Sequence, residues 1–106
     1  MASSPGSAIR FDDFELDIGA AELRCKGEAL PVEPQVFDLI RLLVENAGRV
    51  VSRDDIIEHV WGGRIVSDTA ISTRINAARR ALGDDGKTQR YVKTIQRRGF
   101  RFEVQP

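Results

Sequence analysis

The sequence predicts an α+β domain in which a small antiparallel sheet is followed by three helices and a closing β-hairpin. Two changes of period support this prediction. Apolar and polar residues alternate over the first thirty positions, apolar residues then recur at helical spacing, and alternation returns after residue 90. With 106 residues, 42% of them hydrophobic, the chain can bury one core but not two independently stable ones.

The chain carries no secretory or membrane signal that its sequence would reveal. Residues 1–7 lack the basic and apolar regions of a signal peptide, so residues 1–8 are expected to form a flexible tail before one domain at 9–106. The longest aliphatic run, residues 42–44, is far too short to span a bilayer. Cys25 is the only cysteine, which excludes an intrachain disulfide. We therefore expect a cytoplasmic domain without membrane contact.

The first predicted element is a small antiparallel β-sheet. Residues 14–18 and 23–25 alternate between apolar and polar side chains, which is strand periodicity. Lys26-Gly27 lies between the segments 23–25 and 28–30, and this spacing suits a tight hairpin because Gly accepts a positive φ.

Two helices are predicted next. Apolar residues recur at helical spacing from Val36 to Ala47, with Pro34 acceptable in the first turn and Gly48 as the stop. The second helix begins after Ser52, and Asp55, three residues later, resembles the partner residue of a capping box. Two glycines end this helix, whose apolar face consists of Ile56, Ile57, Val60 and Trp61.

The third helix is predicted over residues 67–82, capped by Ser67 or Asp68 and stopped by Gly83. Its buried stripe consists of Ile71, Ile75, Ala78 and Leu82. After a Gly-Asp-Asp-Gly loop, residues 91–95 and 100–104 alternate around Gln96-Arg97-Arg98-Gly99, which predicts a closing hairpin.

The charge of the chain is unevenly distributed along the sequence. The net charge is zero, which by itself argues against a nucleic-acid partner. Residues 74–101, however, hold nine basic and two acidic side chains, whereas residues 1–73 hold seven basic and thirteen acidic ones. The C-terminal part of the chain therefore suits a polyanion.

The outer face of the third helix suits base edges in a DNA major groove. A helical wheel places four polar residues opposite the buried stripe: Thr69, Thr73, Asn76 and Arg80. Asn can pair bidentately with adenine and Arg with guanine, while a Thr methyl can contact thymine. Small Ser72 and Ala77 allow a close approach to the groove floor. Arg74 and Arg79 lie at the borders of this face, from which they could reach phosphates.

The arrangement of these elements is typical of a winged helix-turn-helix. A solvated surface helix is the simpler interpretation of one basic helix, and a soluble turn is the simpler interpretation of Arg97-Arg98 at a hairpin tip. Together, two short helices joined by a Gly-containing turn and followed by an Arg-rich hairpin favour double-stranded DNA. Helix 67–82 would enter the major groove, and wing 90–104 would contact the minor groove or phosphates.

Five segments combine in a characteristic order and spacing: QVFDLIRLL at 35–43, GRVVSRDD at 48–55, VWG at 60–62, RRALGD at 79–84 and RGFRF at 98–102. In these segments the chain resembles the OmpR/PhoB-type winged-helix DNA-binding domains of bacterial transcriptional regulators. The resemblance implies a four-stranded N-terminal antiparallel sheet, three helices and a C-terminal hairpin wing. It also implies DNA contacts at Thr69, Thr73, Arg74, Asn76, Ala77, Arg79, Arg98 and Arg101.

The resemblance has further implications for partners and for placement. The loop from Gly62 to Ser67 matches a segment that engages RNA polymerase in some members, and a tandem dimer on DNA is a further expected arrangement. The VSDTA start of the third helix and the GDDG loop after it resemble ToxR/CadC-type members, in which this domain comes first and another region follows.

The chain also departs from the pattern of many response regulators. Thr69, Ile71, Arg74 and Ala77 stand where many of those members have Arg, Val, His and Arg. The operator sequence of a relative therefore does not transfer to this chain.

No enzymatic activity, cofactor, metal or small-molecule substrate is predicted. His59 is the only histidine, and neither a Gly-rich phosphate loop nor metal-ligand spacing occurs in the sequence. His59 is interpreted as a partly exposed structural residue and Trp61 as a core anchor.

Two other binding functions stay open. A winged-helix module could dock an acidic protein partner through its Arg residues, although the sequence shows no exposed aromatic cluster of the kind protein hot spots use. RNA is disfavoured, because the deep, narrow A-form major groove does not admit a reading helix.

Overall fold

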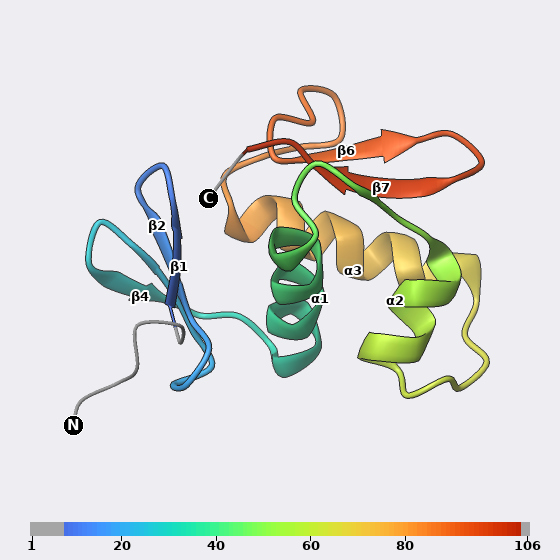
Figure 1. Ribbon diagram of the computed structural model, residues 1–106, viewed down its shortest axis with the longest axis horizontal. Coiled ribbons are helices and arrows are strands. Elements are labelled where there is room, and N and C mark those ends of the chain that lie inside the picture. The colour runs from blue at the N-terminus through green and yellow to red at the C-terminus, as the bar shows by residue number, and fades with distance from the viewer. Residues whose placement is uncertain (1–7, 105–106) are drawn as a thin grey trace.

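A computed structural model describes residues 8–104 of the chain (Figure 1). The elements in order are β1 (Ala8–Phe11), β2 (Phe14–Asp17), β3 (Glu22–Cys25), β4 (Glu28–Leu30), α1 (Pro34–Glu45), β5 (Val50–Val51), α2 (Arg53–Val60), α3 (Asp68–Ala81), β6 (Val92–Ile95) and β7 (Gly99–Phe102). The expected tail, residues 1–8, lies outside the described residues except for Ala8, which begins β1.

The N-terminal strands form the expected four-stranded antiparallel sheet in the order β1-β2-β3-β4. The Lys26-Gly27 turn has φ values of 52° and 85°, the two positive angles that a tight hairpin turn of this kind requires. Leu16 pairs with Leu23 in the register and both are fully buried, so this face of the sheet packs into the core.

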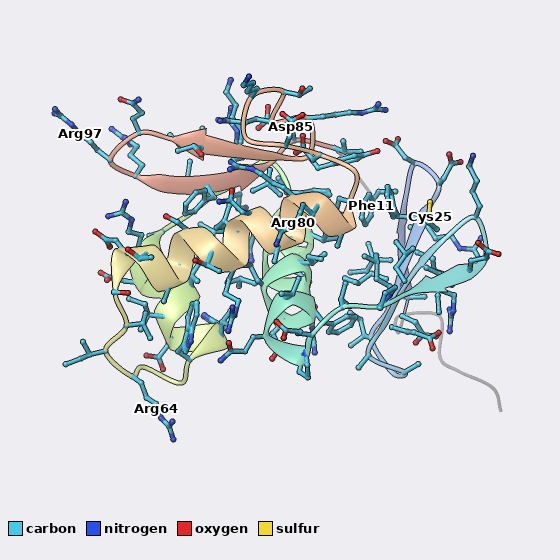
Figure 2. The ribbon with its side chains drawn as sticks, turned by 180° about the vertical axis from the view of Figure 1, so that it is seen from behind. Phe11, Cys25, Arg64, Arg80, Asp85 and Arg97 are labelled. Carbon is cyan, nitrogen blue, oxygen red and sulfur yellow. The ribbon has the colours of Figure 1, made fainter. Side chains whose placement is uncertain are left out.

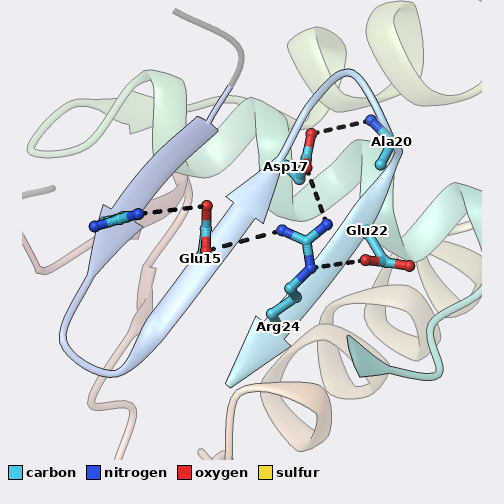
Figure 3. Close-up of polar contacts among 6 residues, drawn as sticks. Glu15, Asp17, Ala20, Glu22 and Arg24 are labelled. Carbon is cyan, nitrogen blue, oxygen red and sulfur yellow. Dashed lines mark hydrogen bonds and ion pairs between the residues drawn. The ribbon is translucent and has the colours of Figure 1, made fainter. Parts of the chain in front are cut away.

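The outer face of the same sheet carries an ion-pair cluster around Arg24 (Figure 3). The Arg24 guanidinium lies 3.0 Å from the Asp17 carboxylate, 2.8 Å from Glu22 and 3.8 Å from Glu15. The backbone N–H of Ala20 and the Arg24 guanidinium together lower the pKa of Asp17. Arg24 thus neutralises part of the negative charge of the N-terminal half, on a sheet face that is open to solvent.

The α1 helix ends at Glu45, before the stop predicted at Gly48. The Asn46 side chain donates a hydrogen bond to the Leu42 carbonyl at 2.8 Å, and the Asn46 backbone N–H donates to Leu43. Asn46 therefore satisfies carbonyls of the last turn, and the chain leaves the helix before the glycine is reached.

The predicted caps of the next two helices are present. Ser52 Oγ accepts from the Asp55 N–H at 3.0 Å, and the Asp55 carboxylate accepts from the Ser52 N–H at 3.3 Å, which completes a capping box. Ser67 Oγ accepts from the Ala70 N–H at 3.1 Å at the start of α3. The predicted apolar stripe of α3 is buried throughout, at Ile71, Ile75, Ala78 and Leu82.

The closing hairpin belongs to a three-stranded sheet in the order β5-β7-β6. The sequence did not predict β5, because two residues are too short to show a period. Val51 pairs with Phe100 of β7, so β5 ties the chain segment before α2 to the wing.

One hydrophobic core joins the two sheets and the helices. In Figure 1, α1 stands between the N-terminal sheet and α2, and the hairpin of β6 and β7 lies over α3. The Phe11 and Phe102 rings meet edge to face at 5.0 Å, and Tyr91 donates a hydrogen bond to Asp12 at 2.8 Å. No helix within residues 8–104 is long and apolar enough to cross a membrane.

Candidate nucleic-acid interface

The outer face of α3 is open and polar. Five of the predicted site residues of this helix are exposed: Thr69, Ser72, Thr73, Asn76 and Arg80. Helical spacing places them opposite the buried stripe. Since that stripe packs into the core, these residues face solvent. The face therefore offers hydroxyl, amide and guanidinium groups on a rigid helix.

The Thr73 hydroxyl is already engaged within the helix. Its Oγ1 donates to the Thr69 carbonyl at 2.8 Å, one turn earlier in α3. A hydroxyl whose hydrogen is committed in this way offers a ligand only its lone pairs and the neighbouring methyl group. Thr73 is thus better suited to apolar contact than to donating a hydrogen bond.

Arg74 is half-buried at the border of the open face and is held by a residue of α1. Its Nε donates to Gln35 Oε1 at 2.9 Å. Sequence reasoning missed Gln35, because 39 positions separate the two residues and no local pattern links them. The contact uses only Nε, so the two terminal nitrogens keep their donors for another acceptor.

Arg79 is not at the border where the helical wheel placed it, and the prediction that it reaches phosphates is wrong for this structure. The residue is only 6% exposed. Its Nε and Nη2 donate to the Val92 carbonyl at 3.1 and 3.0 Å, and Nη2 also donates to Thr94 Oγ1 at 2.9 Å. A helical wheel gives the angle of a side chain but cannot reveal that β6 crosses the end of α3.

Ala77 is also more enclosed than the open face around it. It is half-buried and packs against the edge of the core. It lines a shallow groove of about 410 Å³ together with Leu30, Val32, Val36 and Arg80, among others. Ala77 therefore borders the exposed face rather than standing at its centre.

The wing ends in two exposed arginines, Arg97 and Arg98. Figure 2 shows Arg97 extending away from the body of the molecule at the free end of the hairpin. Arg97 has a φ of 66°, which is unusual for a residue with a side chain. Arg101, on β7, is half-buried, and its Nε donates to Glu103 at 2.6 Å, so its charge is partly offset.

Gly99 closes the wing against β5. Its φ is 142°, and a Cβ at this position would lie 2.0 Å from the Val51 carbonyl oxygen. No real Cβ tolerates such a distance to backbone, so only glycine fits at this crossing.

The loop before α3 carries a completely exposed apolar residue. Ile65 is 100% exposed, and its neighbour Arg64 extends from the loop into solvent (Figure 2). His59, at the end of α2, is exposed and its Nδ1 lies 2.8 Å from the Asp55 carbonyl oxygen. Trp61 is half-buried against the core, where the sequence placed it as an anchor.

Residues 27–102 match the family described as "Transcriptional regulatory protein, C terminal". The chain belongs to this family. Its predicted resemblance to OmpR/PhoB-type domains is confirmed. Its relatives include bacterial transcriptional regulators, as expected.

Two much longer relatives contain a segment similar to this OmpR/PhoB-type domain. The chain is 34% identical over 92 residues to the transcriptional regulator HilA of Salmonella typhimurium, covering 87% of this chain and 16% of HilA. It is 33% identical over 97 residues to the transcriptional activator CadC of Escherichia coli, covering 91% of this chain and 19% of CadC. The chain thus spans less than a fifth of either relative.

The fold of this OmpR/PhoB-type domain is that of known winged helices. The DNA-binding domain of CpxR from Escherichia coli superposes with a TM-score of 0.81 at 31% sequence identity, and the match covers 97% of this chain and all of that domain. The predicted architecture of four-stranded sheet, three helices and hairpin wing is therefore confirmed.

Proposed function

We propose that this domain binds a specific sequence of double-stranded DNA as the DNA-reading part of a bacterial transcriptional regulator. The α3 helix lies in the major groove, and the wing contacts the adjacent minor groove or phosphates. The observation that carries the proposal is the combination of an exposed polar face on α3 with two exposed arginines at the wing tip. The family membership supports the same role.

We assign base reading and backbone contact to different side chains. Asn76 and Arg80 are exposed on the open face and have the donors and acceptors that read adenine and guanine edges. Arg97 and Arg98 supply positive charge at the end of the hairpin, where a narrow minor groove or a phosphate would attract it. Arg74 is half-buried beside the reading face and can position the helix on a phosphate.

Selection of duplexes from a random DNA library tests the proposal directly. We expect one enriched motif, and we expect Asn76→Ala to change the preference at one base pair by about 1–3 kcal/mol. Lys87→Ala, an exposed change in the loop after α3, is the control and leaves the motif as it was. Failure of any duplex to be enriched would refute sequence-specific binding.

Salt dependence separates phosphate contact from base reading. We expect affinity for random duplex DNA to fall steeply with salt and Arg98→Ala to reduce the slope of log affinity against log salt by about one. Arg10→Ala is the matched control, since Arg10 has an 80% exposed side chain on the distant N-terminal sheet. Salt-independent or absent binding to duplex DNA would count against the proposal, and absent binding would leave the alternative of a module that docks an acidic protein.

The loop at residues 62–67 is proposed to contact RNA polymerase when the domain is bound to its site. The specific observation is Ile65, which is completely exposed although it is aliphatic. Ile65→Ala should lower transcription in a reconstituted assay with full-length regulator, while its affinity for DNA stays the same. Equal transcription by the unaltered regulator and the Ile65→Ala variant would mean that the loop only connects α2 and α3.

Two copies in tandem on neighbouring half-sites are the proposed assembly on DNA. The acidic residues 1–73 and the basic residues 74–101 of successive copies are complementary in charge. Titration of a duplex with one and with two copies of the selected motif tests this. Stronger binding per site on the double motif supports tandem association, and equal binding contradicts it.

A further inference from the structure

The outer edge of β6 is occupied by side chains instead of a neighbouring strand. β6 is an edge strand in the order β5-β7-β6, and edge strands normally expose unpaired N–H and C=O groups. Here Arg79 binds the Val92 carbonyl, Asp84 accepts from the Val92 N–H at 3.2 Å, and Gln89 Oε1 accepts from the Thr94 N–H at 2.9 Å. These side chains come from α3 and from the loop that follows it.

Arg79 and Asp84 are the two buried charged residues among residues 8–104. Burying a charge is costly unless hydrogen bonds or an opposite charge compensate it. The Arg79 guanidinium donates hydrogen bonds to Val92 and Thr94 of β6 instead of to solvent. Burial lowers the pKa of the Arg79 guanidinium, and the nearby Asp84 carboxylate partly opposes that effect.

Asp84 organises the chain between α3 and the wing. One carboxylate oxygen accepts from the backbone N–H groups of Asp85 and Arg90, both at 2.8 Å, and the other accepts from Tyr91 at 2.9 Å and from Val92. The Asp84 N–H itself donates to the Arg79 carbonyl at 2.7 Å. The end of α3 and the beginning of β6 are therefore bound to the same two residues.

We propose that Arg79, Asp84 and Thr94 form a joint that fixes the wing relative to the reading face of α3. They are positioning residues for DNA binding, and this inference rests on the proposed function. The joint holds the outer edge of β6 at Val92 and Thr94, and Arg97 and Arg98 belong to the tight turn that follows this strand, where the Arg98 N–H donates to the Ile95 carbonyl at 3.0 Å. A shift of β6 relative to α3 is therefore passed directly to the two arginines of the turn, and a binding site tolerates displacements of only about 0.5 Å.

A double-mutant cycle between the joint and the wing tip tests this role. Thr94→Val removes the hydroxyl that accepts from Arg79 and keeps the size of the side chain. We expect Arg98→Ala to weaken binding to the selected duplex roughly tenfold in the unaltered domain. In the Thr94→Val background it should weaken binding less than about twofold, because the tip is already misplaced.

Two further arms separate positioning from general loss of structure. The effect of Asn76→Ala on affinity should be the same with and without Thr94→Val, since Asn76 lies on α3 and does not depend on the wing. Thr88→Val makes the same chemical change at an exposed threonine outside the joint and should leave the effect of Arg98→Ala at its original size. Thr94→Ser, which retains the hydroxyl, should restore that effect.

The outcomes distinguish the inference from the proposed function. Equal cost of Arg98→Ala in the Thr94→Val and unaltered backgrounds would show that the joint only stabilises the fold, and would overturn the inference alone. Absence of any duplex binding by the unaltered domain would overturn the proposed function and the inference with it. Thermal melting of each variant verifies that the proteins compared are folded. Arg79→Gln is a second variant of the joint, and it should reduce the effect of Arg98→Ala in the same way.

Discussion

The contact between Gln35 and Arg74 shows how one hydrogen bond can prepare a recognition residue. A free arginine has many rotamers, and immobilising it on a ligand costs conformational entropy. Gln35 on α1 already accepts from Arg74 Nε, so part of this ordering is completed in the unbound domain.

We predict that Gln35→Ala weakens DNA binding by about three- to tenfold, because Arg74 loses its support. In an Arg74→Ala background the same change should have little effect, since nothing remains to be positioned. Fluorescence anisotropy on the selected duplex measures all four proteins. Asp38→Ala, an exposed change one turn further along α1, is the control, and additive losses would contradict the coupling.

We predict that Gly99→Ala lowers the free energy of unfolding by at least about 2 kcal/mol. The added Cβ would collide with the Val51 carbonyl and meet a φ of 142°, so β5 and β7 would have to separate. Urea denaturation measures the loss. Gly86→Ala should cost less than about 1 kcal/mol, because its Cβ would meet only the far end of Arg79 at 3.8 Å. Similar losses in the two variants would argue against the close approach.

Among the elements, the stability of α2 depends most clearly on interactions at the start of the helix. It has eight residues, only Ile56 among them is buried, and helices of this length gain little from propensity alone. The capping box of Ser52 and Asp55 satisfies the first N–H groups, and β5 holds the segment just before it. The short helix is therefore defined by its cap and its strand rather than by its interior.

We predict that Ser52→Ala destabilises the domain by about 1 kcal/mol through loss of this cap. Ser72→Ala, in the middle of α3 and exposed, should be neutral or stabilise by up to about 0.5 kcal/mol, because alanine is the better helix former. Thermal and urea unfolding of both variants provide the comparison. Equal effects of the two serine changes would mean that the capping box contributes nothing.

For the whole molecule, the buried Asp84 makes stability depend on pH. Burial raises the pKa of its carboxyl group, but four backbone N–H donors lower it by more, and the net result is a lowered pKa in the folded state. The unfolded chain therefore takes up the proton first as pH falls. The contribution of Asp84 is complete above the ordinary carboxyl pKa of 3.8 and is lost as pH falls toward the lower folded value.

We predict that the free energy of unfolding is level above about pH 5 and declines below it, and that Asp84→Asn makes this decline shallower. Asp17 and Asp85 have lowered pKa values too, so the variant should keep part of the dependence. Urea unfolding between pH 7 and pH 3 measures both proteins. A parallel decline in the variant would show that Asp84 has no part in it.

Local patterns predicted most of the elements because they act within one turn or one strand. Helix caps at Ser52 and Ser67, the Lys26-Gly27 turn and the buried stripe of α3 each depend on residues a few positions apart. The open polar face of α3 follows from the same stripe, since the opposite side of a packed helix meets solvent. The two-residue β5 and the end of α1 at Asn46 escaped prediction because neither shows a period.

The sequence by itself determined the fold class, the order of the elements and the charged, exposed surface of α3 and the wing, because these depend on short-range periodicity and composition. Only the tertiary structure decided the roles of Arg74, Arg79 and Gln35. Arginine side chains are long enough to turn toward solvent or toward a neighbouring element. Which partner they meet depends on elements that lie far apart in the chain and come together only when the core packs.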